Sequence, residues 1–209
     1  MFNNRQEAGE KLALKLKKNI NSTDESKRDF IVVALLRGGI ILGKKISDYL
    51  KIPLMPLAVK KIGAPPNPEL AIGAVTFDKI SYFDNKLIKY LNVDGDYVDR
   101  VLNEKWKEIE NFQNKFVRKN FLEDKKVIIV DDGVATGATA ICASFYAKKE
   151  KARQVILAAP VIEKDTLRNI RRYFDKIVSL RIVNSLGSVG QFYKYFPQIT
   201  DEEVLNLLI

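Results

Sequence analysis

The chain has 209 residues, of which 46% are hydrophobic and 29% charged, as is ordinary for a globular protein with a hydrophobic core. It contains no histidine and one cysteine, Cys142, which excludes histidine-based catalysis, histidine-ligated zinc, intrachain disulfides and thiolate clusters. Thirty-five Lys and Arg against 26 Asp and Glu leave a net charge of +9, but the basic pairs are scattered along the chain. This scatter is typical of a solvated surface and argues against nucleic acid as a partner.

The sequence contains no segment that resembles a targeting signal or a membrane span. Its first residues lack an apolar signal core, and no apolar run approaches the roughly 20 residues that cross a bilayer. A single cysteine gives no sign of an oxidising compartment. We therefore expect a cytoplasmic protein without a membrane partner.

The apolar pattern alternates between helical and strand periods along the chain. In chain order, it predicts a helix over 5–18, a loop over 21–28, a strand over 30–36, a helix over 40–50, a strand over 54–59, short antiparallel strands within 73–83, a helix over 94–120, a strand over 127–130, a helix over 138–149, a strand over 155–161, a helix over 164–173, a strand over 177–183 and a last helix that a capping box opens at 200–203 and that reaches 208.

Strands that alternate with helices favour right-handed crossovers and a mostly parallel sheet. The predicted fold class is therefore α/β, with a mostly parallel five-stranded sheet flanked by helices and a small accessory part that is helical and antiparallel. We expect a single domain over 1–209, with a core at about 30–183 and accessory elements at 1–20, 73–120 and 184–209. In such sheets, ligands bind beyond the carboxyl ends of the strands.

The most informative stretch is VIIVDDGVATGAT, residues 127–139. Its strand ends in two carboxylates, Asp131 and Asp132, and a loop of small and hydroxyl residues follows before a helix begins. The backbone amides of residues 135–139 at a helix N-terminus form a phosphate cradle. Carboxylates repel a phosphate but suit ribose hydroxyls or Mg²⁺. The pattern therefore indicates a sugar phosphate, and the alternative is a solvated strand end.

These thirteen residues resemble the 5-phosphoribosyl 1-pyrophosphate (PRPP) motif of type I phosphoribosyltransferases, with Gly133 where many members carry an apolar residue. The resemblance covers roughly residues 30–183 and is nearest to a poorly characterised branch of predicted phosphoribosyltransferases. It implies that Asp131 and Asp132 hold the ribose hydroxyls. It also implies that five residues surround the 5′-phosphate: Ala135, Thr136, Gly137, Ala138 and Thr139.

Two further segments stand where the family grips pyrophosphate. Arg37, Gly38 and Gly39 follow the first core strand, where paired glycines let amides approach an anion and Arg37 adds a bidentate donor. Lys60 and Lys61 end the second strand, where family members often place a basic residue. The alternatives are a plain strand-to-helix turn for the first segment and a solvated surface for the second. The candidate catalytic residues are Asp131, Asp132, Lys60 and Lys61.

A proline-rich segment follows these lysines. Three prolines at positions 65, 66 and 68 lack amide donors, so we expect no regular structure over 63–69. The resemblance makes 62–72 the mobile loop that closes over the site and excludes water. The alternative is a static turn.

The resemblance implies transfer of 5-phosphoribosyl from PRPP to a nitrogenous base, a purine being favoured, with release of pyrophosphate. Mg²⁺ would arrive with PRPP, near Asp131 and Asp132, and the protein alone would hold no metal. Phe192 and Tyr193 are candidates to stack on the base, or else pack a hood or a dimer contact. A homodimer is expected because the family often dimerises. The rival is a regulator that senses PRPP or a nucleotide without catalysis.

Overall fold

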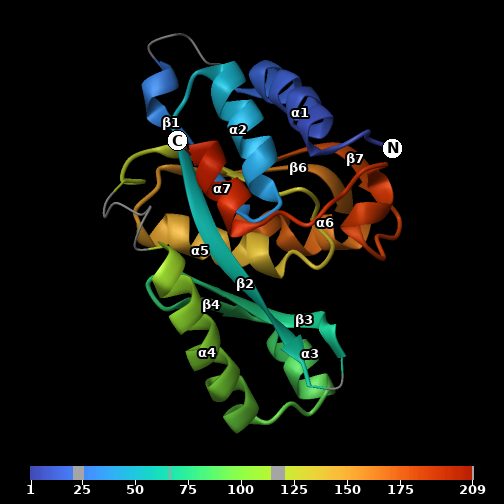
Figure 1. The fold of residues 1–209 in the computed structure, drawn as a ribbon. Helices are drawn as coiled ribbons and strands as arrows, with labels where there is room; N and C mark the ends of the chain where they lie inside the picture. Colours follow the sequence, from blue (N-terminus) through green and yellow to red (C-terminus); the bar gives the residue numbers. More distant parts are fainter. Residues whose placement is uncertain (21–25, 66, 114–120, 209) are drawn as a thin grey trace.

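The computed structural model describes residues 1–20, 26–65, 67–113 and 121–208. Within them, seven strands form one sheet in the order β4-β3-β2-β1-β5-β6-β7 (Figure 1). Five neighbouring strands are parallel, namely β2 (Leu54–Ala64), β1 (Phe30–Leu36), β5 (Lys126–Val130), β6 (Gln154–Glu163) and β7 (Lys176–Val183). The parallel five-stranded core is therefore confirmed. The antiparallel strands β3 (Asn67–Thr76) and β4 (Ile80–Phe83) extend this same sheet beyond β2.

Both faces of the central parallel strands β1, β5 and β6 are buried, which explains their continuous apolar runs. In β1, Ile31 and Val33 point to one face and pack with α5 (Ala138–Lys149) and α6 (Lys164–Ile170). Val32 points to the opposite face and packs with α1 (Arg5–Asn19) and α2 (Gly39–Leu50). The last helix, α7 (Asp201–Leu208), covers the end of this second face beside α2.

The capping box that opens α7 is confirmed. The Thr200 amide donates to the Glu203 carboxylate at 2.8 Å, and the Glu203 amide donates to Thr200 Oγ1 at 3.1 Å. These two bonds satisfy amides that the helix itself leaves without partners.

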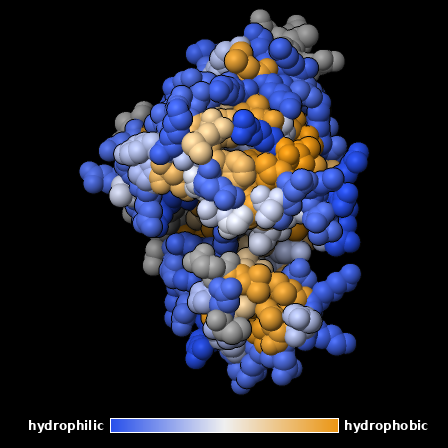
Figure 2. Space-filling view, turned by 90° about the vertical axis from the view of Figure 1, so that its right-hand side faces the viewer, coloured by the Kyte–Doolittle hydropathy of each residue, from blue (hydrophilic) through white to orange (hydrophobic). Residues whose placement is uncertain are grey.

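A lower lobe extends from the sheet at the point where β2 continues beyond the ends of its parallel neighbours (Figure 1). It consists of the end of β2, β3, β4, α3 (Asn85–Tyr90) and α4 (Gly95–Gln113). Apolar side chains of α4 pack on the side of β2 and β3 that carries Ala58 and Ile62. Figure 2 shows a narrow waist between the lobe and the rest of the molecule, with apolar surface gathered on both parts.

The expectation of no regular structure over 63–69 is wrong. Gly63 and Ala64 belong to β2, residues 67–69 belong to β3, and the two strands pair as an antiparallel hairpin. Register shifts on both sides of Gly63 absorb the irregularity. A Cβ on Gly63 would lie 2.3 Å from the Pro68 carbonyl oxygen, so glycine allows the proline-bearing strand to approach this closely. Residues 62–72 are therefore mainly a hairpin and not a free loop.

Other boundaries differ by a few residues. The predicted helix over 164–173 ends at Ile170 and continues as a 3₁₀ turn, Arg171–Tyr173. The predicted helix over 94–120 corresponds to α4, and its last seven positions lie outside the described residues. The short helix α3 was not predicted, and its N-cap is Asp84, whose carboxylate accepts from the amides of Lys86 and Leu87. In the described part of the chain, no helix is long and apolar enough to cross a membrane.

Candidate active site

The acidic pair and the loop after it lie at the carboxyl edge of the sheet, as predicted. Asp131 and Asp132 directly follow β5, and α5 begins at Ala138. Gly137 caps this helix with φ +79°, a left-handed conformation that favours glycine, and a Cβ there would lie 2.6 Å from the Ile170 side chain. The first amides of α5 therefore face the loop without a bulky side chain at the cap.

The loop is tied to the end of the neighbouring strand, β6. The Val134 amide donates to the Val161 carbonyl at 2.9 Å, and the Glu163 amide donates to the Val134 carbonyl at 3.2 Å. The Thr166 hydroxyl donates to the Ala135 carbonyl. These bonds hold the loop in a defined shape, as an anion cradle built from backbone amides requires.

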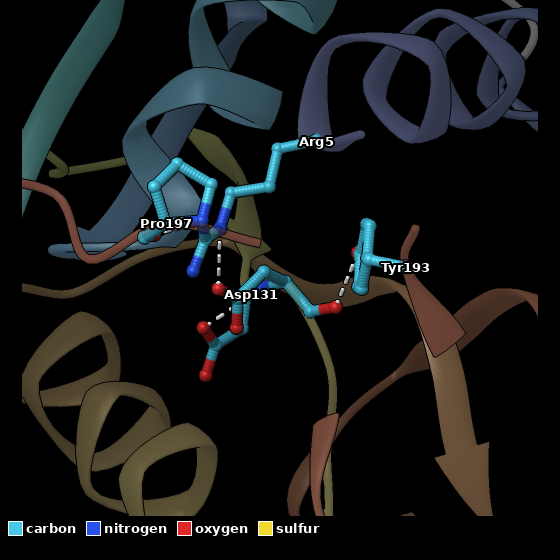
Figure 3. A network of polar contacts seen from close by, with 5 residues as sticks. Arg5, Asp131, Tyr193 and Pro197 are labelled. Atoms are coloured by element: carbon cyan, nitrogen blue, oxygen red, sulfur yellow. Dashed lines mark hydrogen bonds and ion pairs between the residues drawn. The ribbon is translucent and has the colours of Figure 1, made fainter. Parts of the chain in front are cut away.

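Asp132 is held by a residue that the sequence analysis did not single out. Arg5, in the first turn of α1, donates from Nε to Asp132 Oδ2 at 2.8 Å (Figure 3). Its Nη1 donates to the Pro197 carbonyl at 2.7 Å, and its guanidinium lies 3.6 Å from the centre of the Phe196 ring. Arg5 is buried, and its spacing from Ala8 and Leu12 places it on the apolar face of its helix. The sequence feature that could have identified Arg5 is an arginine on the otherwise apolar face of a predicted helix.

Asp131 lies beside Asp132 but in a different environment. The Asp132 amide donates to Asp131 Oδ1 at 2.9 Å. Burial and the charge of Asp132 raise the pKa of Asp131, whereas the Asp132 amide and the Lys61 charge act against this shift. The guanidinium of Arg5 is committed to Asp132, so the two carboxylates are electrostatically unequal.

The glycine-rich turn after β1 touches this acidic pair. The Leu36–Arg37 peptide bond is cis. A Cβ on Gly38 would lie 1.9 Å from Asp132 Oδ2, and one on Gly39 would lie 2.5 Å from the Val130 carbonyl oxygen. Glycine is favoured at both positions, because a Cβ on residue 38 would displace the Asp132 carboxylate and one on residue 39 would displace the end of β5.

The two lysines of β2 point to opposite faces, as the alternation of a strand demands. Lys60 Nζ lies 3.3 Å from a carboxylate oxygen of Glu108 on α4. With Arg37, whose Nη1 lies 3.8 Å from the Asp201 carboxylate, it lines a cavity of about 250 Å³. Lys61 instead lies on the side of the acidic pair.

A second, larger hollow of about 540 Å³ contains the acidic site. The sheet edge supplies Lys61, Asp132, Ala135 and Thr136 to its lining. The remaining lining residues are Arg5, Glu163, Thr166, Leu186, Gly187, Ser188, Val189, Gly190 and Phe196. The structure thus divides the predicted pyrophosphate group, with Arg37 and Lys60 in one cavity and Lys61 in the other.

The C-terminal segment forms one wall of the larger hollow. Phe2 pairs in parallel with Tyr193, so the start of the chain lies against the segment that precedes α7. Tyr193 is buried, and its hydroxyl donates to the Asp132 carbonyl at 2.6 Å (Figure 3). Its expected stacking on a base does not fit this placement, because its ring packs against Phe2 and Phe196. Phe192 packs on the cluster beneath α1, and Phe196 is the aromatic residue that lines the hollow.

The acidic pair fits a hard cation only in part. In the described residues, no group of three or more His, Cys, Asp or Glu side chains is placed to hold a metal ion. Two adjacent carboxylates match the way Mg²⁺ is bound together with a phosphorylated substrate, through one or two carboxylates, substrate oxygens and water.

A parallel α/β sheet with an acidic pair and a glycine-capped loop at its carboxyl edge is typical of proteins that bind a phosphorylated small molecule. A family model described as "Phosphoribosyl transferase domain" matches residues 4–190. The chain therefore belongs to the phosphoribosyl transferase domain family.

Individual relatives agree with this family. In Mycobacterium tuberculosis, "Putative phosphoribosyl transferase Rv0571c" is 32% identical over 211 residues, which cover all of this chain and 46% of the relative. The chain thus spans about half the length of the curated relatives it matches.

Solved structures show the same fold. The protein TT1426 from Thermus thermophilus superposes with a TM-score of 0.75 at 27% identity and covers 99% of this chain and 97% of its own. The AQ2163 protein from Aquifex aeolicus has a TM-score of 0.56 at 15% identity and covers 89% of this chain and 78% of its own.

Proposed function

We propose that this protein transfers the 5-phosphoribosyl group of PRPP to a nitrogen of a base and releases pyrophosphate. The observation that carries this proposal is a single hollow in which Asp132 and the amide-rich loop are neighbours, with Asp131 directly beside Asp132. The loop suits the 5′-phosphate and the carboxylates suit the ribose hydroxyls, so together they suit one ribose 5-phosphate.

In the proposed reaction, the bond between C1 of the ribose and the pyrophosphate oxygen breaks, and pyrophosphate leaves with the electron pair. The acceptor nitrogen forms the new bond to C1, and the acceptor loses one proton to solvent. Positive charge develops on the ribose ring, and the chain's contribution is to position the ring and stabilise charge. Asp131 and Asp132 orient the hydroxyls, and Arg5 keeps the Asp132 carboxylate in place.

Residues 135–139 would hold the 5′-phosphate through backbone amides and the hydroxyls of Thr136 and Thr139. Gly38 and Gly39 bring the turn after β1 against the acidic pair, where its backbone would meet pyrophosphate. Lys61 is the lysine of β2 that lines this hollow, and Arg37 and Lys60 would have to leave Asp201 and Glu108 to contact the leaving group.

Mg²⁺ is proposed to arrive with PRPP, next to Asp131 and Asp132. When bound, it would neutralise charge on the pyrophosphate. Closure of residues 62–72, a homodimer and a cytoplasmic location stay predictions.

A pyrophosphate-release assay tests the proposal. Purified protein is mixed with Mg²⁺, PRPP and, in turn, adenine, guanine, hypoxanthine, uracil and cytosine. We expect base-dependent release with at least one base. PRPP binding in calorimetry without release for any base would overturn catalysis and favour the sensing regulator.

A further inference from the structure

One carboxylate in the larger hollow has no part in holding phosphoribose. Glu163 is the last residue of β6, one strand along the sheet edge from the acidic pair, and its half-buried side chain lines the hollow. The single proton of the Thr166 hydroxyl is shared between Glu163 Oε2, at 3.1 Å from Oγ1, and the Ala135 carbonyl. Among the described residues, no Lys or Arg lies within ion-pair distance of Glu163.

An unpaired carboxylate here is unfavourable for PRPP itself. The tie from Thr166 to both Glu163 and the Ala135 carbonyl shows that the carboxylate lies close to the proposed phosphate loop. Like charges repel, and a partly buried carboxylate whose one hydrogen bond is shared with the Ala135 carbonyl carries a desolvation cost. Glu163 therefore suits another part of the bound molecule, one that offers hydrogen-bond donors.

Other lining residues of the hollow suit a flat molecule. Leu186, Gly187, Ser188, Val189 and Gly190 line it with mostly small side chains, and Phe196 adds an aromatic ring. A Cβ on Gly133 would lie 2.6 Å from the Val189 side chain, so glycine lets this segment approach the acidic motif closely. The hollow thus combines small and aromatic lining residues with a second carboxylate besides Asp132.

We propose that Glu163 reads the acceptor, and that the acceptor is a base with an exocyclic amino group. The inference rests on the proposed function and names the substrate class of the same hollow. A carboxylate has two oxygens with about four acceptor positions, of which Thr166 uses one. An amino group next to a ring N–H can donate to both oxygens at once. A base that presents an oxo group there places oxygen against oxygen, which sites built for hydrogen bonding reject strongly.

The alternative is that Glu163 only fixes Thr166 and, through it, the loop. The two roles differ in a measurable way. If Glu163 has a structural role, its replacement affects the affinity for every ligand alike. If Glu163 recognises the base, its replacement changes the ratio of the affinities for an amino base and its oxo counterpart.

The test compares nucleoside 5′-monophosphates that share the ribose phosphate and differ in the amino group. The Kd values of the pairs GMP and XMP, AMP and IMP, and CMP and UMP are measured by calorimetry, so catalysis is not needed. We expect the wild-type protein to bind the amino member at least tenfold more tightly in one pair or more.

Three variants separate the roles. Glu163→Gln keeps an acceptor for Thr166 but adds an amide donor, and it should reduce or invert the preferred ratio, while the Kd of PRPP stays the same or falls because a repelling charge is removed. Thr166→Val should weaken all ligands by a similar factor and leave the ratio unchanged. Glu123→Gln removes a surface carboxylate that pairs with Lys151 and serves as the charge-matched control.

Equal affinity within all wild-type pairs, or a Glu163→Gln variant that keeps the wild-type ratio, would overturn the assignment. Failure of the proposed function has another signature, namely no PRPP binding and no release of pyrophosphate.

Discussion

Gly38→Ala should destabilise the protein through Asp132. The new methyl would lie 1.9 Å from Oδ2 and 2.6 Å from Cγ of Asp132. To restore even 3.0 Å, the oxygen must withdraw by about 1.1 Å, which breaks its 2.8 Å bond to Arg5 unless Arg5 follows. Arg5 is not free to follow, because Pro197 and Phe196 hold its guanidinium.

The cost follows from the burial of this ion pair. Separating a buried pair costs about 3 kcal/mol, at the low end of the range for removing one partner. For a chain of this size, that loss lowers the melting temperature by about 6–12 °C. Differential scanning calorimetry of the ligand-free protein measures it. Gly187→Ala is the control, since a Cβ there meets nothing within 4 Å, and its effect should stay within about 0.5 kcal/mol.

A double-mutant cycle tests the cause. If the Arg5–Asp132 tie carries the loss, Gly38→Ala should cost much less in an Arg5→Met background than in the wild type. Additive losses would mean that the methyl acts elsewhere. A melting temperature for Gly38→Ala equal to that of Gly187→Ala would refute the reasoning altogether.

Four further predictions concern the charged groups. Asp131→Asn should weaken PRPP binding at least tenfold in calorimetry, with little loss of stability. Asp132→Asn should also lower the melting temperature, because Arg5 loses its charged partner. Equal melting temperatures for the two variants would contradict this. The raised pKa of Asp131 means that the folded protein binds more protons than the unfolded chain, so the free energy of unfolding should fall as pH rises from the ordinary Asp pKa to the raised one. Urea titrations across this pH range should show that the free energy of unfolding falls less with pH in Asp131→Asn than in the wild type. The same dependence on pH in both proteins would contradict the raised pKa of Asp131. Lys61→Ala should weaken PRPP binding by about tenfold, or about 1.4 kcal/mol. Lys60→Ala should weaken it less, because Lys61 lines the acidic hollow whereas Lys60 pairs with Glu108. The opposite order of the two Kd values in calorimetry would assign pyrophosphate to the smaller cavity. EDTA should abolish pyrophosphate release without changing the melting temperature, and unfolding on chelation would reveal a structural metal.

Local sequence patterns were sufficient for the core of the fold and for the acidic motif. Continuous apolar runs in β1, β5 and β6 reflect strands buried on both faces, so they predict a parallel sheet without knowledge of its partners. Residues 131–139 are contiguous, and their placement depends on one strand, one loop and one helix. The capping box at Thr200 is equally local.

Only the tertiary structure decided which distant residues complete the site. Arg5 reaches Asp132 across 127 positions of sequence, and Tyr193 reaches it across 61, because the first residues pair with the segment around Tyr193. Adjacency in sequence also misled, since Lys60 and Lys61 look equivalent but strand alternation sends them into different cavities. Prolines near position 66 predicted an irregular loop, yet strand pairing with a register shift outweighed that local preference. A local sequence pattern carries no information on the pairing energies between remote segments. The sequence by itself therefore determined the parallel sheet and the loop that follows β5. Which remote residues surround that loop was decided only by the folded chain.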